Sequence, residues 1–223
     1  MKNLNLALKL KYLHYLRNMG FAYTAPLKDF EIQESFELPS DMVSLRASCL
    51  SCHLCELAKT RTNVVFGEGN EQANIMFVGE GPGETEDKTG RPFVGNAGEV
   101  LTKMIENVIG IKREETYIAN IVKCRPPNNR VPTPSECASC KPYLEKQIEL
   151  ISPKLIVALG GTSLNALTGQ NYSIMKMRGS VLDYHGIPLI PTYHPSFIIR
   201  NPNTAKKPAY ADMLLVKSYL EKI

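Results

Sequence analysis

Asn74-Ile-Met-Phe-Val-Gly79 is a short apolar run that ends in glycine, and it predicts a buried strand. Three further apolar runs occupy residues 116–122, 155–160 and 187–193. Because the runs are mostly uniformly apolar rather than alternating, we expect both faces of the sheet to be covered. Pro188 and Pro191 in the last run favour an edge position for that strand.

Helical stretches lie between these runs and after the last of them, at residues 97–108, 134–151, 162–168 and 210–220. Alternation of strands with helices is typical of a mostly parallel sheet, because parallel neighbours need a crossover connection. The sequence therefore predicts an α/β fold. We expect a three-layer α/β/α sandwich around a short, mostly parallel central sheet, with an N-terminal helical extension.

The first 45 residues differ from the rest of the chain. Leu6, Leu10, Leu13 and Leu16 recur at helical spacing in a basic segment, and a looser stretch with Pro26 and Pro39 follows. We interpret residues 1–45 as a helical extension and tether, and residues 46–223 as the main domain. The extension packs on the domain surface or forms a basic arm that contacts DNA.

Composition narrows the class of protein. Hydrophobic residues make up 43% of the 223 residues and charged residues 22%, which excludes a disordered or fibrous chain. The sequence contains neither a run long enough to span a bilayer nor a signal peptide, so we expect a soluble, cytoplasmic protein. A formal charge of +4 is compatible with a nucleic-acid partner without demonstrating one.

Glycine or polar residues stand where each predicted strand ends. These strand ends are the Gly79-Glu-Gly-Pro-Gly83 turn, Asn120, the Gly160-Gly161 pair and His194-Pro-Ser196. Carboxyl ends of parallel strands meet at one edge of a sheet, so the four loops predict one binding site. The Gly79–Gly83 turn has neither the GxGxxG pattern nor the Lys-Ser/Thr of a phosphate-binding loop, which disfavours nucleoside triphosphates.

Three side chains near these loops have a functional and a structural interpretation each. Phe93, in Thr89-Gly-Arg-Pro-Phe-Val-Gly95, offers a stacking surface for a base or fills the core. Asn120 pairs with the edge of a nucleobase or is an ordinary satisfied amide. His194 either acts at the edge of the site or has a structural role.

Six cysteines at short spacings indicate a metal site in a chain without an export signal. Cys49, Cys52 and Cys55 form a ferredoxin-like run, Cys137 and Cys140 form a second CxxC pair, and Cys124 stands in a Cys-Arg-Pro turn. Four thiolates hold an iron–sulfur cluster or tetrahedral zinc, and free thiols are the third alternative. Spacing alone does not identify the four ligands.

Four motifs in order resemble those of the family 4 uracil-DNA glycosylases, which are bacterial and archaeal enzymes with a 4Fe–4S cluster. The motifs are Gly79-Glu-Gly-Pro-Gly-Glu-Thr-Glu-Asp87, Thr89-Gly-Arg-Pro-Phe-Val-Gly95, Asn120-Ile-Val-Lys-Cys-Arg-Pro-Pro-Asn-Asn-Arg130 and His194-Pro-Ser-Phe-Ile-Ile-Arg200. The resemblance runs from about Ser48 to the C-terminus. It implies an enzyme that flips uracil out of DNA and hydrolyses its N-glycosidic bond, leaving an abasic site.

The resemblance also implies the cluster ligands, which map onto Cys52, Cys55, Cys124 and Cys140. Cys49 and Cys137 are then spare, and the cluster has a mainly structural role. The resemblance further implies that Phe93 stacks on uracil, that Asn120 reads its edge and that the main chain around Glu80 and Gly81 contacts it.

The resemblance also implies that His194 hydrogen-bonds uracil O2 as the bond to the sugar breaks. His194 is therefore the first candidate for catalysis. The aspartate that serves as general base in the best-known uracil glycosylases is absent from the Gly79–Gly83 turn. Glu86 and Asn129 are candidates for orienting the attacking water.

Residues 196–200 resemble the loop that enters the minor groove, where an apolar side chain acts as a wedge. The candidates for the wedge are Phe197, Ile198 and Ile199. DNA contacts are expected from Ser196, Phe197 and Arg200, with Lys206 and Lys207 near phosphates. The partner is uracil-containing DNA, and we expect a monomer without membrane association, with the N-terminal extension available to a replication or repair partner.

Two other functions remain open from the residues alone. One is a relative in the same superfamily that also removes other deaminated bases, such as hypoxanthine. The second is a four-cysteine zinc module that binds nucleic acid without catalysis. A redox carrier would leave Phe93, Asn120 and His194 without a role.

Overall fold

The computed structural model describes residues 38–222, and these form one compact unit. The helix predicted around Leu6–Leu16 and its tether lie outside the described residues, apart from the last part of the tether. Helix α2 (Met42–Leu50) begins where the Asp41 side chain accepts a hydrogen bond from the N–H of Ser44. The folded unit therefore begins a few residues before the boundary that we placed at residue 46.

Six strands form one mixed sheet in the order β1-β3-β2-β4-β6-β5. The strands are β1 (Glu68–Gly69), β2 (Ile75–Gly79), β3 (Tyr117–Asn120), β4 (Leu155–Leu159), β5 (Leu182–Tyr184) and β6 (Ile187–Thr192). The central four, β3, β2, β4 and β6, are parallel, and the two short edge strands are antiparallel to their neighbours. Every residue of β2, β3 and β4 is buried, which is the burial that their uniform apolarity predicts.

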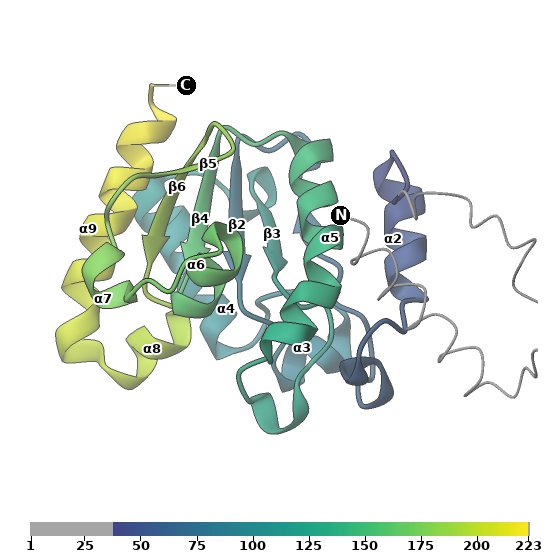
Figure 1. The fold of residues 1–223 in the computed structure, drawn as a ribbon. Coiled ribbons are helices and arrows are strands. Elements are labelled where there is room, and N and C mark those ends of the chain that lie inside the picture. The colour runs from purple at the N-terminus through teal and green to yellow at the C-terminus, as the bar shows by residue number, and fades with distance from the viewer. Residues whose placement is uncertain (1–37, 223) are drawn as a thin grey trace, which may run out of the picture. The chain divides into compact units, whose positions relative to one another are not determined.

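Helices cover both faces of the sheet, as Figure 1 shows with α5 and α6 on the near side and α4 on the far side. The helices are α3 (Glu84–Thr89), α4 (Asn96–Met104), α5 (Pro134–Ile151), α6 (Gly161–Thr168), α7 (Ile174–Met177), α8 (Pro195–Arg200) and α9 (Pro202–Leu220). Short helical turns occupy η2 (Glu56–Lys59), η3 (Ile105–Ile109), η4 (Arg113–Glu115) and η5 (Pro127–Asn129). No helix in residues 38–222 is long and apolar enough to cross a membrane.

Side chains of β2 alternate between two apolar clusters, one on each side of the sheet. Met76 and Val78 pack with α2, α5 and α6, whereas Ile75 and Phe77 pack with α4, α8 and α9. The predicted three-layer α/β/α sandwich is therefore confirmed. β2 lies between β3 and β4, so the strand order reverses direction there, and such a switch point places a crevice at the carboxyl ends of the strands.

The predicted edge position of the fourth apolar run is wrong. β6 pairs with β4 on one side and with β5 on the other. Pro191 is tolerated because it lies beyond β5, whose three residues pair with Ile187, Pro188 and Leu189. The main-chain oxygen of Pro191 is used by the N–H of Gly179, outside the strands. The two edge strands were not predicted, because runs of two and three residues give no periodic signal.

A buried ion pair fixes β6 against α9. Arg178 donates to the carboxylate of Asp212 on α9, and the hydroxyl of Thr192, the last residue of β6, donates to the same carboxylate at 2.7 Å. Helix α9 begins at Pro202, eight residues earlier than predicted, with Pro208 inside it. His194 follows two residues after Thr192, so this network holds the chain segment that carries His194.

Candidate active site

Asn120 ends β3 directly beside Gly79, its parallel partner at the end of β2. A Cβ atom at Gly79 would lie 2.4 Å from Asn120 Oδ1 and 2.5 Å from Cζ of Phe93, so only glycine leaves room for both side chains. Asn120 is 1% exposed, and its Oδ1 is the one buried side-chain N or O atom in residues 38–222 without a hydrogen-bond partner. A buried acceptor without a partner is costly and indicates a position for a ligand donor.

Phe93 lies against this amide in a strained backbone conformation. Its φ is +50°, in the left-handed region that an aromatic residue rarely adopts. Hydrogen bonds on both sides of Phe93 hold this strained conformation. Arg113 donates to the carbonyl of Pro92 at 2.8 Å, and the N–H of Val94 donates to Glu86 Oε1 at 3.0 Å. Such strain is typical of functional positions. The Phe93 ring centroid is 5.8 Å from that of His194, so the structure brings Phe93, Asn120 and His194 together.

His194 precedes α8 and caps its N-terminus. Nδ1 accepts a hydrogen bond from the N–H of Ser196 at 3.2 Å and lies 2.7 Å from the Ser196 hydroxyl. Because Nδ1 is an acceptor, the neutral ring carries its proton on Nε2. Burial, with the Arg200 charge acting in the same direction, lowers the pKa of His194 to about 4. The imidazole is therefore a neutral hydrogen-bond donor at neutral pH.

Glu86 has a role that its sequence position did not predict. Its Oε1 accepts from the main-chain N–H groups of Val94 and Gly95 at 3.0 and 2.8 Å, and Oε2 accepts from that of Gly83 at 3.1 Å. The carboxylate thus ties the glycine turn after β2 to the segment that follows Phe93. These contacts make Glu86 a brace of the site and do not support the water-orienting role predicted for it.

Asn129, the other candidate for orienting water, lies exposed in η5. Its Oδ1 accepts from Nε of Arg125 at 2.7 Å, and the Arg125 guanidinium lies 3.7 Å from Glu84. The role of Asn129 in orienting water therefore stays a prediction. Glu80 and Gly81 run beside the chain that leaves β3, where the Glu80 carbonyl accepts from the N–H of Val122 at 3.1 Å.

The segment predicted as a minor-groove loop is the short helix α8. Pro195 at its first position and the His194 cap explain why these residues become helical. Ile198 is buried in the core and Phe197 packs on Tyr193 with ring centroids 4.9 Å apart, whereas Ile199 is 44% exposed. Of the three apolar residues that were wedge candidates, Ile199 is the most exposed.

Five of the six cysteines line one cavity. They come from α2, from the turn before η2, from the chain after β3 and from α5, and they are Cys49, Cys52, Cys55, Cys124 and Cys140. Cys137 is not among the lining residues, whereas Cys49, which the resemblance set aside as spare, is one of them. No three His, Cys, Asp or Glu side chains in residues 38–222 are grouped to hold a single metal ion.

Two N–H groups point at sulfur atoms of this cavity. Arg61 Nη1 donates to Cys124 Sγ at 3.2 Å, and the main-chain N–H of Lys123 donates to Cys140 Sγ at 3.2 Å. Burial raises the pKa of Cys55 and of Cys124, so ionised thiols here need a cation to compensate them. Sequence reasoning assigned no role at the cysteines to Arg61 or Lys123, although Arg61 follows Cys52 and Cys55 along the chain and Lys123 directly precedes Cys124.

The family of the chain follows from two comparisons. A model of the uracil DNA glycosylase superfamily matches residues 66–215, a range that contains Phe93, Asn120 and His194. The chain therefore belongs to the uracil-DNA glycosylase superfamily, as its motifs predicted.

Individual relatives narrow the assignment. A type-4 uracil-DNA glycosylase of Thermotoga maritima is 49% identical over 193 residues, covering 85% of this chain and 97% of the relative. The type-4 enzymes of Sulfurisphaera tokodaii (49% identity; 73% of this chain, 77% of the relative) and Archaeoglobus fulgidus (45%; 69% and 80%) are also similar. The chain belongs to the type-4 uracil-DNA glycosylases.

Proposed function

We propose that this protein is a DNA-repair enzyme that flips uracil out of DNA and hydrolyses its N-glycosidic bond, leaving an abasic site. The observation that carries the proposal is the unpaired Oδ1 of Asn120, buried between Gly79 and Phe93 at the edge of the sheet. A flipped base stacked on Phe93 supplies the missing donor. Unstacking the nucleotide costs a few kcal/mol, which stacking in the site offsets in part.

Asn120 distinguishes uracil from cytosine by the direction of its hydrogen bonds. Uracil offers an N3–H donor to Oδ1 and an O4 acceptor to the side-chain NH₂ group, whereas cytosine reverses this pattern. Oδ1 already lies without a partner, so a base with an acceptor at position 3 leaves it unpaired. The main chain at Glu80 and Gly81 forms the neighbouring part of the binding surface.

His194 stabilises the leaving group. Cleavage develops negative charge on uracil O2, and the Nε2–H of neutral His194 donates to that oxygen more strongly as the charge grows. Ser196 fixes the ring by its N–H bond to Nδ1. No lysine nucleophile is required, so the enzyme is a monofunctional hydrolase and leaves the DNA strand intact.

Four thiols fit the 4Fe–4S cluster implied by the family: Cys52, Cys55, Cys124 and Cys140. The cavity that they line has N–H donors to the sulfur atoms of Cys124 and Cys140, which stabilise thiolates. When bound, the cluster supplies a structural cross-link rather than chemistry on the base. The ligands join the segment before η2, the chain after β3 and α5.

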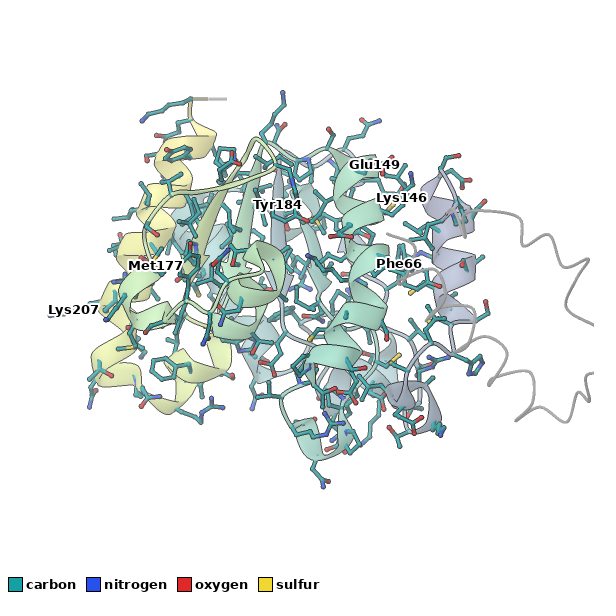
Figure 2. The ribbon with its side chains drawn as sticks, viewed as in Figure 1. Phe66, Lys146, Glu149, Met177, Tyr184 and Lys207 are labelled. Atoms are coloured by element: carbon teal, nitrogen blue, oxygen red, sulfur yellow. The ribbon has the colours of Figure 1, made fainter. Side chains whose placement is uncertain are left out.

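DNA contacts are proposed for the surface around α8. Ser196, Phe197 and the exposed Arg200 lie there, and exposed Ile199 suits the wedge that fills the gap left by the flipped nucleotide. Lys206 and Lys207 are also exposed at the start of α9, and Figure 2 shows Lys207 directed away from the core. Phosphate contacts by these cations make binding weaken as salt rises.

Labelled oligonucleotides containing one uracil, one hypoxanthine or only cytosine at the same position test the proposal. Incubation with the full chain and then with alkali should cleave the uracil strand alone, and without alkali the strand should stay intact. Cleavage at hypoxanthine as well would favour the relative of broader specificity. A protein that binds DNA but releases no base would contradict the enzyme proposal.

Serine substitutions at Cys140 and Cys137 form a matched pair that tests the assignment of the cluster ligands. We expect Cys140→Ser to abolish the broad visible absorbance and the iron of the purified protein, because Cys140 lines the cavity. Cys137→Ser should retain both, since Cys137 lies outside the lining. Iron analysis and the visible spectrum measure this, and equal iron in the two variants would refute the ligand assignment.

The lowered pKa of His194 predicts the pH dependence of catalysis. A histidine with the usual pKa near 6.5 is about nine-tenths protonated at pH 5.5. With a pKa of about 4, His194 stays neutral there, so single-turnover kcat should be nearly equal at pH 5.5 and 7.5. A tenfold fall of kcat between these values, with the visible spectrum unchanged, would show that the imidazole titrates in the ordinary range.

Substitutions at Glu86 and Glu84 test whether Glu86 braces the site or orients the attacking water. Glu86→Gln loses carboxylate bonds to three main-chain N–H groups and should lower the free energy of unfolding by about 1–3 kcal/mol. Glu84→Gln breaks only surface ion pairs, with Lys88 and Arg125, and should change the free energy of unfolding by less than about 0.5 kcal/mol. Urea unfolding measures both. A Glu86→Gln protein of wild-type stability with a strongly lowered kcat would support the water-orienting role instead.

A further inference from the structure

Lys123 is a buried lysine that the proposed chemistry leaves without a role. It is 1% exposed, and its Nζ donates to the main-chain carbonyl of Asn120 at 2.9 Å and to Oε1 of Gln147 at 2.6 Å. None of the carboxylates in residues 38–222 forms an ion pair with it. A buried ammonium without a carboxylate needs another negative charge, because desolvation of an isolated ion is costly.

That negative charge is available from the cysteine cavity. Lys123 lies in the cavity wall, its main-chain N–H donates to Cys140 Sγ, and the next residue is the proposed ligand Cys124. The ionisable groups whose charges reach Lys123 are the thiols Cys140, Cys49 and Cys124. Lys123 thus contacts the main chain of the base-reading Asn120 through its side chain and the sulfur of Cys140 through its main-chain N–H.

Gln147 makes this arrangement rigid. It is fully buried on α5, and its Nε2 donates to the carbonyl of Phe66 and to the hydroxyl of Tyr117, both at 3.0 Å. Phe66 lies between α5 and α2 in Figure 2, beneath the Arg46 guanidinium at 4.8 Å from its ring centroid. The acceptor for Lys123 Nζ is therefore fixed on two sides.

We propose that Lys123 is a positioning residue whose ammonium is the counter-charge of the cluster thiolates and holds the end of β3, so that the cluster and the base-reading Asn120 are coupled through one side chain. The inference rests on the proposed function, since Asn120 is the group that it positions. Two consequences follow. Removing the cation makes the cluster harder to reduce, because reduction adds negative charge, and it loosens Asn120 against the flipped base.

Lys123→Met, with a side chain of similar length and no charge, tests both consequences in the full, cluster-containing chain. Lys146→Met is the control, since Lys146 pairs with Glu149 of the same helix, and Figure 2 labels both residues beside α5. For Lys123→Met we expect a more negative cluster midpoint potential, a KM for uracil DNA about tenfold higher and a smaller change in kcat. The control should match wild type in all three.

A second variant covers the case in which Lys123→Met loses the cluster. Gln147→Glu keeps the side-chain volume and places a competing carboxylate beside Nζ, so it should also lower the midpoint potential. Wild-type potentials in the variants that hold a cluster, or a wild-type KM in Lys123→Met, would overturn the inference. The potential is measured by reductive titration without DNA. A wild-type protein that fails to excise uracil would therefore contradict the proposed function. The effect of Lys123 on the midpoint potential would still be measurable.

Discussion

His194→Ala is expected to lower kcat for uracil excision by about 10²–10³-fold, the usual cost of removing one donor from a site that stabilises developing negative charge. The donor acts on O2 only as the glycosidic bond breaks, so KM should change by less than about threefold. Ring orientation is set by the N–H of Ser196, and glycine at position 160 leaves room for the ring, because a Cβ there would lie 3.0 Å from His194 Cβ.

Single-turnover kinetics on a uracil-containing duplex measure the effect of His194→Ala. His185→Ala is the matched control, since His185 lies exposed in the turn between β5 and β6, beside Tyr184. The control should retain wild-type kcat. A loss below about tenfold in His194→Ala would mean that leaving-group stabilisation comes from main-chain donors instead.

Asn120→Asp is expected to lower kcat/KM for uracil by about a hundredfold or more, since a matched pair of base-edge hydrogen bonds contributes up to about 3 kcal/mol. The carboxylate cannot donate to O4, and its charge repels the uracil anion that forms. The effect should appear in both kcat and KM, because Asn120 contacts the base before and during cleavage.

Asn70→Asp provides the control for Asn120→Asp, because Asn70 is exposed and its Oδ1 accepts only from the N–H of Gln72. Both variants are assayed on uracil and cytosine oligonucleotides of one sequence. Wild-type kcat/KM for uracil in Asn120→Asp would show that the unpaired Oδ1 does not read the base. We expect Asn120→Asp to keep the visible spectrum of the wild-type protein. Its loss of activity then arises at the base-binding site and not at the cysteine cavity.

Local sequence pattern was sufficient for the parallel strands and for the edge of the sheet where the site lies. The uniform apolarity of residues 74–79 and 155–160 predicted buried strands, and the polar residues after each run marked one edge. The pattern misplaced β6, because proline content is a local property while strand pairing depends on a distant partner, β5.

The contacts that assemble the site were less predictable. Glu86 was chosen for its charge, but its function in the fold comes from three N–H groups, one of which is nine residues away. A lysine is expected on the surface from its residue type alone. Lys123 is buried because the chain after β3 packs against α5, where Gln147 accepts its hydrogen bond. Spacing grouped Cys49 with Cys52 and Cys55, the family resemblance set it aside as spare, and the fold places it in the cavity wall.

The distribution of the cavity cysteines along the chain has a consequence for synthesis. All four proposed ligands have left the ribosome once residue 140 and the helix around it emerge, whereas β4, β6 and the His194 segment follow later. Residues 38–222 form one unit, and a domain generally folds as a unit. The proposed ligands and Asn120 are therefore synthesised before the segment that carries His194 but are buried only together with it.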